Sequence, residues 1–391
     1  MDSGYPNGGF SSKRAGAFYA AYFGVFGVLL PYLGPYLQLR GIGAVGIGLI
    51  TAALSLAKLL YAPLVGHGVD RGVWPRGLLT LHALLAVVSA AALWWLDGTV
   101  ALGIAFFLLG LGHATVLPLV EAAILERRPP SRYGAVRLWG SVGFIVLATA
   151  VAPLLSGGKL VRFPFYLAGI LGVLVVTCLP FEEGARPRHE PSSGGSLSPA
   201  VWALLVLLTL HQVAHGPYYA FFSITLAGEG YSSTTIGALW SFSVLAEAVA
   251  FAFGGRLQDR IGVRRLLGLA LLATPFRWLA ISLSAALPVL VLAQAGHAFS
   301  FALAHLAGIQ LVQRAAPPGA RRRAQALYSG LTFGLGIVVG SSLAGPVYGR
   351  LGGRGAFAVA AIFSTVVFAA WLPLAPRLGS RREDQKMTLE T

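Results

Sequence analysis

A short basic loop reads Gly255-Arg256-Leu257-Gln258-Asp259-Arg260-Ile261-Gly262-Val263-Arg264-Arg265 and lies between two long apolar runs. A weaker copy, Gly66-His67-Gly68-Val69-Asp70-Arg71, lies at the matching place in the first half of the chain. A shift of 189 residues pairs Gly66 with Gly255, and the same shift pairs Ile47-Gly48 with Ile236-Gly237. The repeat therefore extends along a whole apolar run. Two halves that repeat in this way predict two similar helical bundles.

The apolar runs indicate that the chain is dissolved in lipid. Of its 391 residues, 56% are hydrophobic and only 11% are charged, whereas a soluble domain has roughly 25% charged residues. Runs of about 20 residues are long enough to cross a hydrocarbon core of ~30 Å. They are continuously apolar rather than alternating, which favours helices over a β-barrel. We therefore expect an all-α integral membrane protein with twelve transmembrane helices in two pseudo-repeated six-helix bundles around a central cavity. The expected spans are 15–38, 45–66, 76–96, 99–125, 134–156, 160–180, 199–227, 233–255, 265–285, 287–313, 324–349 and 355–375.

The net charge of +15 is explained by the positions of Lys and Arg relative to the membrane. An even number of spans puts both termini on one side, and most Lys and Arg residues fall on that side. The opposite loops hold Arg40, Lys159, Arg162, Arg350 and Arg354. Because short cytoplasmic loops are enriched in Lys and Arg, we expect both termini in the cytoplasm and the protein in the inner membrane. Nucleic acid is not an expected partner.

The polar stretches give the expected domain order. They predict a cytoplasmic tail at 1–14, a bundle at 15–180, a linker at 181–198, a second bundle at 199–376 and a tail at 377–391. The first tail does not have the charged start and short apolar core of a cleavable signal peptide. The single cysteine, Cys178, excludes an intramolecular disulfide.

Charged residues inside the spans are the strongest functional signal, because each costs at least roughly 2.5–3.5 kcal/mol at bilayer depth. They are Lys58, Glu121, Arg137, Glu247 and Arg277, joined by His113, His211, His215, His297 and His305. A structural ion pair would explain any one of them, but together they favour a polar cavity. Since the three cations outnumber the two carboxylates, the balance favours a bound organic anion.

Two predicted helices place polar groups among aromatic ones. His211, His215, Tyr218 and Phe222 share one face of their helix, and Trp240, Ser243, Glu247 and Phe251 share a face of the next. Such a lining suits a small ligand with an apolar body and a polar end. The alternative is ordinary helix packing with hydrogen-bonded histidines.

The two basic loops are candidates for a conformational latch. An Asp at a helix end can pair with an Arg of the neighbouring helix in one conformation and separate from it in another. The candidate residues are Asp70, Arg71, Asp259, Arg260, Arg264 and Arg265. The alternative is a capped loop whose arginines only set topology.

The loop at 255–265 resembles the cytoplasmic loop signature of the major facilitator superfamily. Arg137-Leu138-Trp139-Gly140-Ser141-Val142-Gly143-Phe144 and Pro118-Leu119-Val120-Glu121-Ala122 resemble motifs of the lactose permease and 3-phenylpropionic acid transporter group. The likeness to the phenylpropionate-type transporters is closer and extends over nearly the whole chain. It includes His215-Gly216-Pro217-Tyr218-Tyr219, Leu239-Trp240-Ser241, Ala246-Glu247, Arg277-Trp278, Ala286-Leu287-Pro288, His297 and His305-Leu306-Ala307.

This resemblance implies a proton-coupled symporter that alternates between inward-open and outward-open states. In the lactose permease a Glu and an Arg in these motifs hold the sugar, and the matching positions are Glu121 and Arg137. The permease's coupling Arg and His match Arg277 and His297, but its coupling Glu falls on Ser300. We expect Glu247 to take that role, because it is the one carboxylate within a span of the second half.

The sequence thus predicts proton-coupled symport of a small, aromatic carboxylate-like anion by a monomer without cofactor or metal. The expected substrate-binding residues are Glu121, Arg137, Lys58, Trp139, Tyr218, Tyr219, Trp240 and His215, and the expected proton-coupling residues are Glu247, Arg277, His297 and His305. Proton-coupled sugar or nucleoside uptake and proton-antiport efflux are the alternatives. A membrane enzyme is disfavoured, because no Glu follows His211 in the manner of an HExxH zinc motif.

Overall fold

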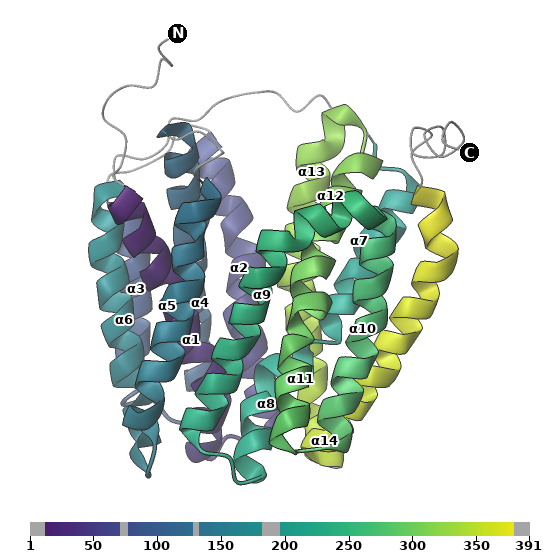
Figure 1. Ribbon diagram of the computed structural model, residues 1–391. Coiled ribbons are helices and arrows are strands. Elements are labelled where there is room, and N and C mark those ends of the chain that lie inside the picture. Colours follow the sequence, from purple (N-terminus) through teal and green to yellow (C-terminus); the bar gives the residue numbers. More distant parts are fainter. Residues whose placement is uncertain (1–11, 71–76, 128–132, 182–195, 379–391) are drawn as a thin grey trace. The chain divides into compact units, whose positions relative to one another are not determined.

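The computed structural model describes residues 12–70, 77–127, 133–181 and 196–378, which form helices and short connections with no β-strand among them (Figure 1). The expected linker at 181–198 lies almost entirely outside the described residues, as do most of the two tails. All of Arg71 and the side chains of Lys58 and Asp70 lie outside them too.

Packing divides the chain into two compact units. Unit 1 comprises Met1–His189 with Tyr219–Leu245, and unit 2 comprises Glu190–Tyr218 with Ala246–Thr391. The chain therefore passes from one unit to the other inside two apolar segments. The bundles expected at 15–180 and 199–376 follow the sequence repeat instead, and they stay a prediction.

Unit 1 is built around the contact between its first and fifth helices. Its helices are α1 (Ser12–Leu39), α2 (Ala44–Asp70), α3 (Leu78–Ala92), α4 (Thr99–Arg127), α5 (Tyr133–Leu155) and α6 (Phe163–Cys178), with most of α8 (Gly216–Gly228) and the first part of α9 (Ser233–Ile261). Helix α1 packs against α5 and α6, and α4 packs against α2 and α3. Gly143 on α5 lies directly against the backbone of Ala20 on α1. Small residues at such a contact let two membrane helices approach closely.

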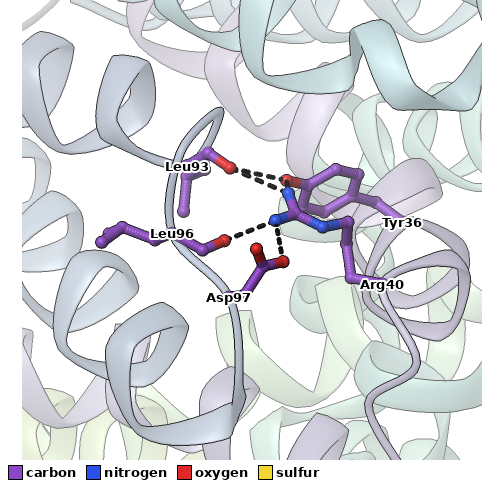
Figure 2. A network of polar contacts seen from close by, with 5 residues as sticks. All are labelled: Tyr36, Arg40, Leu93, Leu96 and Asp97. Carbon is purple, nitrogen blue, oxygen red and sulfur yellow. Dashed lines mark hydrogen bonds and ion pairs between the residues drawn. The ribbon is translucent and has the colours of Figure 1, made fainter.

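An arginine holds together one end of unit 1 (Figure 2). Just after α1, Arg40 donates from Nη1 to the carbonyl oxygen of Leu93 over 2.9 Å and from Nη2 to that of Leu96 over 2.5 Å. It also forms an ion pair with Asp97, and Tyr36 Oη donates to the Leu93 carbonyl over 3.1 Å. The hydrogen bond to Asp97 raises the pKa of Arg40 above its ordinary value. The guanidinium therefore stays charged and ties the end of α1 to the connection between α3 and α4.

Unit 2 contains α7 (Pro199–Val213), the rest of α9, α10 (Val263–Leu283), α11 (Leu287–Ala295), α12 (Ala304–Ala315), α13 (Arg321–Tyr328) and α14 (Gly336–Leu374). Two π-helical segments, η4 (Ala298–Leu303) and η6 (Ser329–Leu335), interrupt its α-helices. Helix α7 begins at a Ser198 cap followed by Pro199, and the Ser198 hydroxyl accepts from the Val201 N–H over 3.4 Å. Helix α10 packs against α14, whose C-terminal part is yellow in Figure 1.

Helix α14 is broken at one glycine. Its 39 residues would extend roughly 58 Å if straight, about twice the ~30 Å hydrocarbon core. Gly352 breaks the helix with φ 67° and ψ −174°, a conformation that glycine adopts without steric cost. The length and the break are those expected of two crossings joined at Gly352.

Ten segments of the described chain are long and apolar enough to cross a membrane. One of them, Pro318–Leu378, has 61 residues and includes the break in α14. The shorter apolar helix Leu78–Ala92 falls outside the ten. An all-α, multi-pass membrane fold is thereby confirmed, while the count of twelve stays a prediction.

The span expected at 199–227 corresponds to one apolar segment, Pro199–Gly228, but a two-residue turn interrupts its helix. Helix α7 ends at Val213 and α8 begins at Gly216. The cause is Pro217, which has no N–H to donate to the carbonyl four residues earlier. Gly216 also lies directly against the backbone of Gly340, where a Cβ atom would collide. His215 therefore lies in a tight turn, with its N–H bonded to the Gln212 carbonyl over 3.0 Å.

Candidate functional site

A partly exposed ion pair lies in unit 1. Arg137 Nε on α5 is 3.9 Å from Glu121 Oε1 on α4, and the two side chains are 36% and 26% exposed. Tyr19 Oη donates to the same carboxylate oxygen over 3.2 Å. The Arg137 guanidinium lies 3.8 Å from the centre of the Phe23 ring, close enough for a cation–π interaction. This group, Tyr19, Phe23, Glu121 and Arg137, is called the Arg137 cluster below.

Backbone and small residues make room for this cluster. Tyr19 and Phe23 are one turn apart on α1, so they present both rings to the same neighbour. Gly140 follows Arg137 by one turn, and a Cβ atom there would meet Phe23 and lie 2.9 Å from Arg137 Nη1. A larger residue at 140 would therefore separate the cation from the ring.

His113 packs beside this cluster in a structural manner. Its ring stacks on Tyr22 with centroids 4.1 Å apart, and Phe26 meets it edge-on at 4.9 Å. Its Nε2 lies 3.2 Å from the Tyr22 carbonyl oxygen. These contacts join α1 to α4.

The aromatic residues predicted to line the substrate site differ in exposure. Trp139 is half exposed and packs against Gly16. Tyr219 is partly buried. Trp240 is fully enclosed: its indole N–H donates to Ser223 Oγ over 2.9 Å and its ring meets Phe222 edge-on. Trp240 thus contributes to the packing of unit 1.

Arg277 lies at the centre of a buried polar cluster in unit 2. It donates from Nε to the Ala293 carbonyl over 2.9 Å, from Nη1 to Ser300 Oγ over 3.0 Å and from Nη2 to Gln294 Oε1 over 3.2 Å. Its guanidinium also lies 4.3 Å from the ring centre of Tyr218. Such a network fixes the orientation of a charge that is only 3% exposed.

Near Arg277 the carboxylate of Glu247 faces the imidazole of His297. Glu247 Oε2 on α9 is 3.6 Å from His297 Nε2, which is ion-pair distance when the imidazole is protonated. His297 is buried, stacks on Phe301 and lies against Tyr218. Glu247 is 24% exposed, whereas the side chain of His297 is 6% exposed. Glu247, Arg277, His297 and Ser300 are called the Arg277 cluster below.

His215 and Tyr218 lie in unit 2 next to the Arg277 cluster. The ring of His215 is buried, lies edge-on to Trp278 at 5.0 Å and has Nδ1 3.1 Å from the His211 carbonyl oxygen. Tyr218 Oη accepts from Gln294 Nε2 over 3.1 Å. Both residues were predicted to bind substrate, and the structure places them beside the predicted proton-coupling residues.

His305 occupies an aromatic enclosure between the two π-helical segments. Its Nδ1 is 2.9 Å from Tyr328 Oη, and Phe333 meets the ring edge-on at 5.2 Å. A cavity of about 10 Å³ adjoins it and is lined by His211 and Thr332, among others. This volume corresponds to about one water molecule. π-Helical turns occur frequently at functional sites.

Sequence reasoning missed several members of these clusters. Tyr19 and Phe23 carried a signal, since their spacing puts aromatic rings on one face of the first span. Gln294 also had a signal in the sequence, because it is a polar amide within an apolar span. Ser300 was noted only as a departure from the lactose permease pattern, yet its hydroxyl binds Arg277.

The latch candidates are partly described. Asp259 and Arg260 lie near the end of α9, and Arg264 and Arg265 lie in the first turn of α10. Gly262 separates the two helices with a φ of 83°, which explains the glycine at that place in the motif. Among the described residues there is no group of three or more His, Cys, Asp or Glu side chains able to hold a metal ion.

The comparisons with known proteins concern the family and the fold. A family model described as "MFS_1 like family" matches residues 14–359. The "Probable 3-phenylpropionic acid transporter" of Escherichia coli (strain K12) is 30% identical over 359 residues, which cover 88% of this chain and 93% of that protein. The "Maltose permease" of Geobacillus stearothermophilus is 30% identical over 332 residues, covering 82% of this chain and 83% of that one. Among solved structures, the nucleoside transporter NupG has a TM-score of 0.79 at 16% identity, covering 93% of this chain and 98% of NupG. At this identity the likeness to NupG shows the fold alone.

Proposed function

Since this chain belongs to the MFS_1 like family and is therefore a multi-pass membrane transporter, not an enzyme, we propose that it carries a small organic anion together with protons. The substrate is an aromatic carboxylate or a compound of similar chemistry. In this proposal unit 1 recognises the anion and unit 2 carries the proton.

The observation that carries the proposal is the Arg137 cluster. A carboxylate forms strong, often paired, hydrogen bonds with a guanidinium. Phe23 and Tyr19 lie beside that guanidinium, so the apolar body of an aromatic acid would contact rings while its carboxylate meets the cation. The E. coli relative named as a probable 3-phenylpropionic acid transporter supports this substrate class. Lys58, Trp139, Tyr219 and Trp240 remain proposed contributors.

The Arg277 cluster suits proton transfer. Glu247 is partly exposed and faces His297 at 3.6 Å, while Arg277 supplies a fixed, oriented positive charge. Protonation of Glu247 would remove one negative charge from a mostly buried region and so change its charge balance. A change of this kind is what a conformational switch requires. His305 is proposed as a further member of the same pathway.

The remaining features of the proposal concern orientation and assembly. The distribution of Lys and Arg supports cytoplasmic termini in an inner membrane. The residues Asp70, Arg71, Asp259, Arg260, Arg264 and Arg265 are proposed as the latch between conformations. A monomer is the proposed state.

A second candidate is proton-coupled transport of a sugar or nucleoside. It is favoured by the proximity of Glu121 to Arg137, because a carboxylate and a guanidinium side by side bind hydroxyl groups as acceptor and donor. The relative named maltose permease is consistent with it. In that case the two residues act together, whereas an anion requires Arg137 alone.

Uptake into proteoliposomes tests the proposal. Purified protein is reconstituted, a pH gradient acid outside is imposed, and radiolabelled 3-phenylpropionate, maltose and uridine are compared. We expect saturable accumulation of 3-phenylpropionate that a protonophore abolishes. Because a neutral aromatic acid crosses lipid unaided, protein-free liposomes and excess unlabelled 3-phenylpropionate provide the baseline. Accumulation of maltose or uridine instead would replace the proposal with the second candidate.

A further inference from the structure

A groove on the outer surface of unit 2 is separate from both clusters. It lies between α7 and the C-terminal part of α14 and has a volume of about 370 Å³. Its walls include Val206 and Leu210 on α7 and Ala370 on α14. Arg377, in the short helix that follows α14, lines one end and is the charged residue of the lining. We call it the α7–α14 groove.

The groove opens toward lipid. Val206 and Leu210 are 53% and 40% exposed, and both helices belong to segments apolar enough to cross the membrane. Exposed aliphatic side chains on such segments contact acyl chains. A groove of about 370 Å³ has room for part of one acyl chain.

The charged end of the groove lies near the membrane surface. Helix α7 begins at Pro199 and α14 ends at Leu374, and Arg377 lies three residues further on. Trp202, in the first turn of α7, is 40% exposed, as is typical of tryptophans at the membrane–water interface. Arg377 is exposed and has no ion-pair partner among the described residues.

The charge at the end of the α7–α14 groove indicates which kind of lipid would bind there. Acyl chains are as apolar as the groove walls, so burial of a chain by itself discriminates little between lipids. An exposed cation at headgroup level does discriminate between lipids, because it attracts an anionic phosphate and is less attracted to a zwitterionic headgroup. Basic sites between membrane helices bind anionic headgroups in this way.

We propose that the α7–α14 groove holds one anionic phospholipid, with an acyl chain along Val206 and Leu210 and the headgroup on Arg377. A single Lys or Arg near an anionic surface contributes enough to change binding about fivefold. The bound lipid is distinct from the transported substrate, because the groove shares no residue with the Arg137 or Arg277 clusters.

Native mass spectrometry of the full-length protein tests this assignment. Delipidated protein in detergent is titrated with phosphatidylglycerol or phosphatidylcholine of identical acyl chains. We expect the first bound lipid to appear at about fivefold lower concentration for phosphatidylglycerol. Arg377→Gln should remove that preference. Arg323→Gln makes the same charge change on another exposed arginine of unit 2 and should keep it.

A variant that fills the groove tests whether the acyl chain of the lipid binds there, as opposed to the headgroup alone being attracted to the protein surface. Ala370→Trp places a ring in the groove without altering charge, and the first lipid of either kind should then bind more weakly. Equal binding of the two lipids by the unmodified protein would overturn the proposal. So would a preference that survives Arg377→Gln, or binding that is unaffected by Ala370→Trp in a protein that elutes as a single monodisperse peak.

Discussion

Arg277 on α10 donates a hydrogen bond of 3.0 Å from Nη1 to the hydroxyl of Ser300 in the π-helical segment η4. The lactose permease resemblance expects a carboxylate at this position. Here the guanidinium binds a neutral hydroxyl, a neutral amide and a backbone carbonyl instead. These three contacts of Arg277 are all with neutral groups, and the carboxylate of Glu247 lies 3.6 Å from His297 Nε2.

Ser300→Ala should destabilise the protein. It leaves one N–H of a buried, charged guanidinium without this acceptor, which costs about 1–3 kcal/mol. Thermal unfolding in detergent would measure a lower Tm. Thr177→Val is the matched control, because the Thr177 hydroxyl bonds only to a carbonyl of its own helix, Leu174. Equal Tm values for the two variants would show that the Ser300 hydroxyl contributes nothing to holding Arg277.

Part of this arrangement was predictable from sequence. Continuous apolar runs locate the spans, because length and composition alone satisfy the requirements of the bilayer. Charges within those runs and the motif resemblance single out Glu121, Arg137, Glu247 and Arg277. The structure brings Arg137 within 3.9 Å of Glu121 and His297 within 3.6 Å of Glu247. Their roles stay predictions.

Other features depend on tertiary contacts that a single sequence does not display. The break at His215 follows from Pro217, but the close approach of Gly216 to Gly340 beside it joins residues far apart in the chain. The contact of Tyr19 with Glu121 joins residues far apart in the chain, and no local pattern pairs them. The π-helical segments likewise have no pattern of hydrophobic spacing that distinguishes them from α-helix.

Glu247→Gln should separate exchange from accumulation. The amide keeps the size of the side chain but cannot take up a proton. We expect exchange of labelled for unlabelled substrate to continue while uptake driven by a pH gradient disappears. Counterflow and gradient-driven uptake in the same proteoliposomes measure the two activities. Glu229→Gln makes the same change at an exposed loop residue and should leave both intact. Uphill uptake by Glu247→Gln would assign the proton to another group.

Gly143→Ala should prevent α1 and α5 from packing. A Cβ atom at 143 would collide with the backbone carbonyl of Ala20, and backbone cannot move aside as a flexible side chain can. Overpacking typically costs about 1–3 kcal/mol, and a backbone obstacle places this variant at the upper end. Gly172→Ala on α6 is the control, since nothing lies within 4 Å of its added Cβ. We expect low yield and a lower Tm for Gly143→Ala alone.

Exchanging Arg40 and Asp97 for each other should not restore the stability of the protein. Each hydrogen bond from a charged donor contributes about 1.5–3 kcal/mol, so Arg40→Asp and Asp97→Arg should each lower the Tm. The double variant restores opposite charges but leaves the carbonyl oxygens of Leu93 and Leu96 without the donors that Arg40 supplied. We therefore expect it to remain unstable. Recovery of the original Tm would mean that the ion pair alone accounts for the contact.

Glu121→Gln distinguishes the two candidate substrates. The change removes a negative charge 3.9 Å from Arg137 and leaves the guanidinium in place. An anionic substrate should then bind as well as before or better, because the carboxylate that competed for the cation is gone. A sugar or nucleoside should bind worse, because an acceptor for its hydroxyls is lost.

Arg137→Gln should raise KM by about tenfold or more for either class of substrate, as expected when a charged hydrogen bond is lost. Initial uptake rates measured over a range of substrate concentrations give KM for each variant. A rise in KM for 3-phenylpropionate in Glu121→Gln would contradict anion recognition by Arg137 alone.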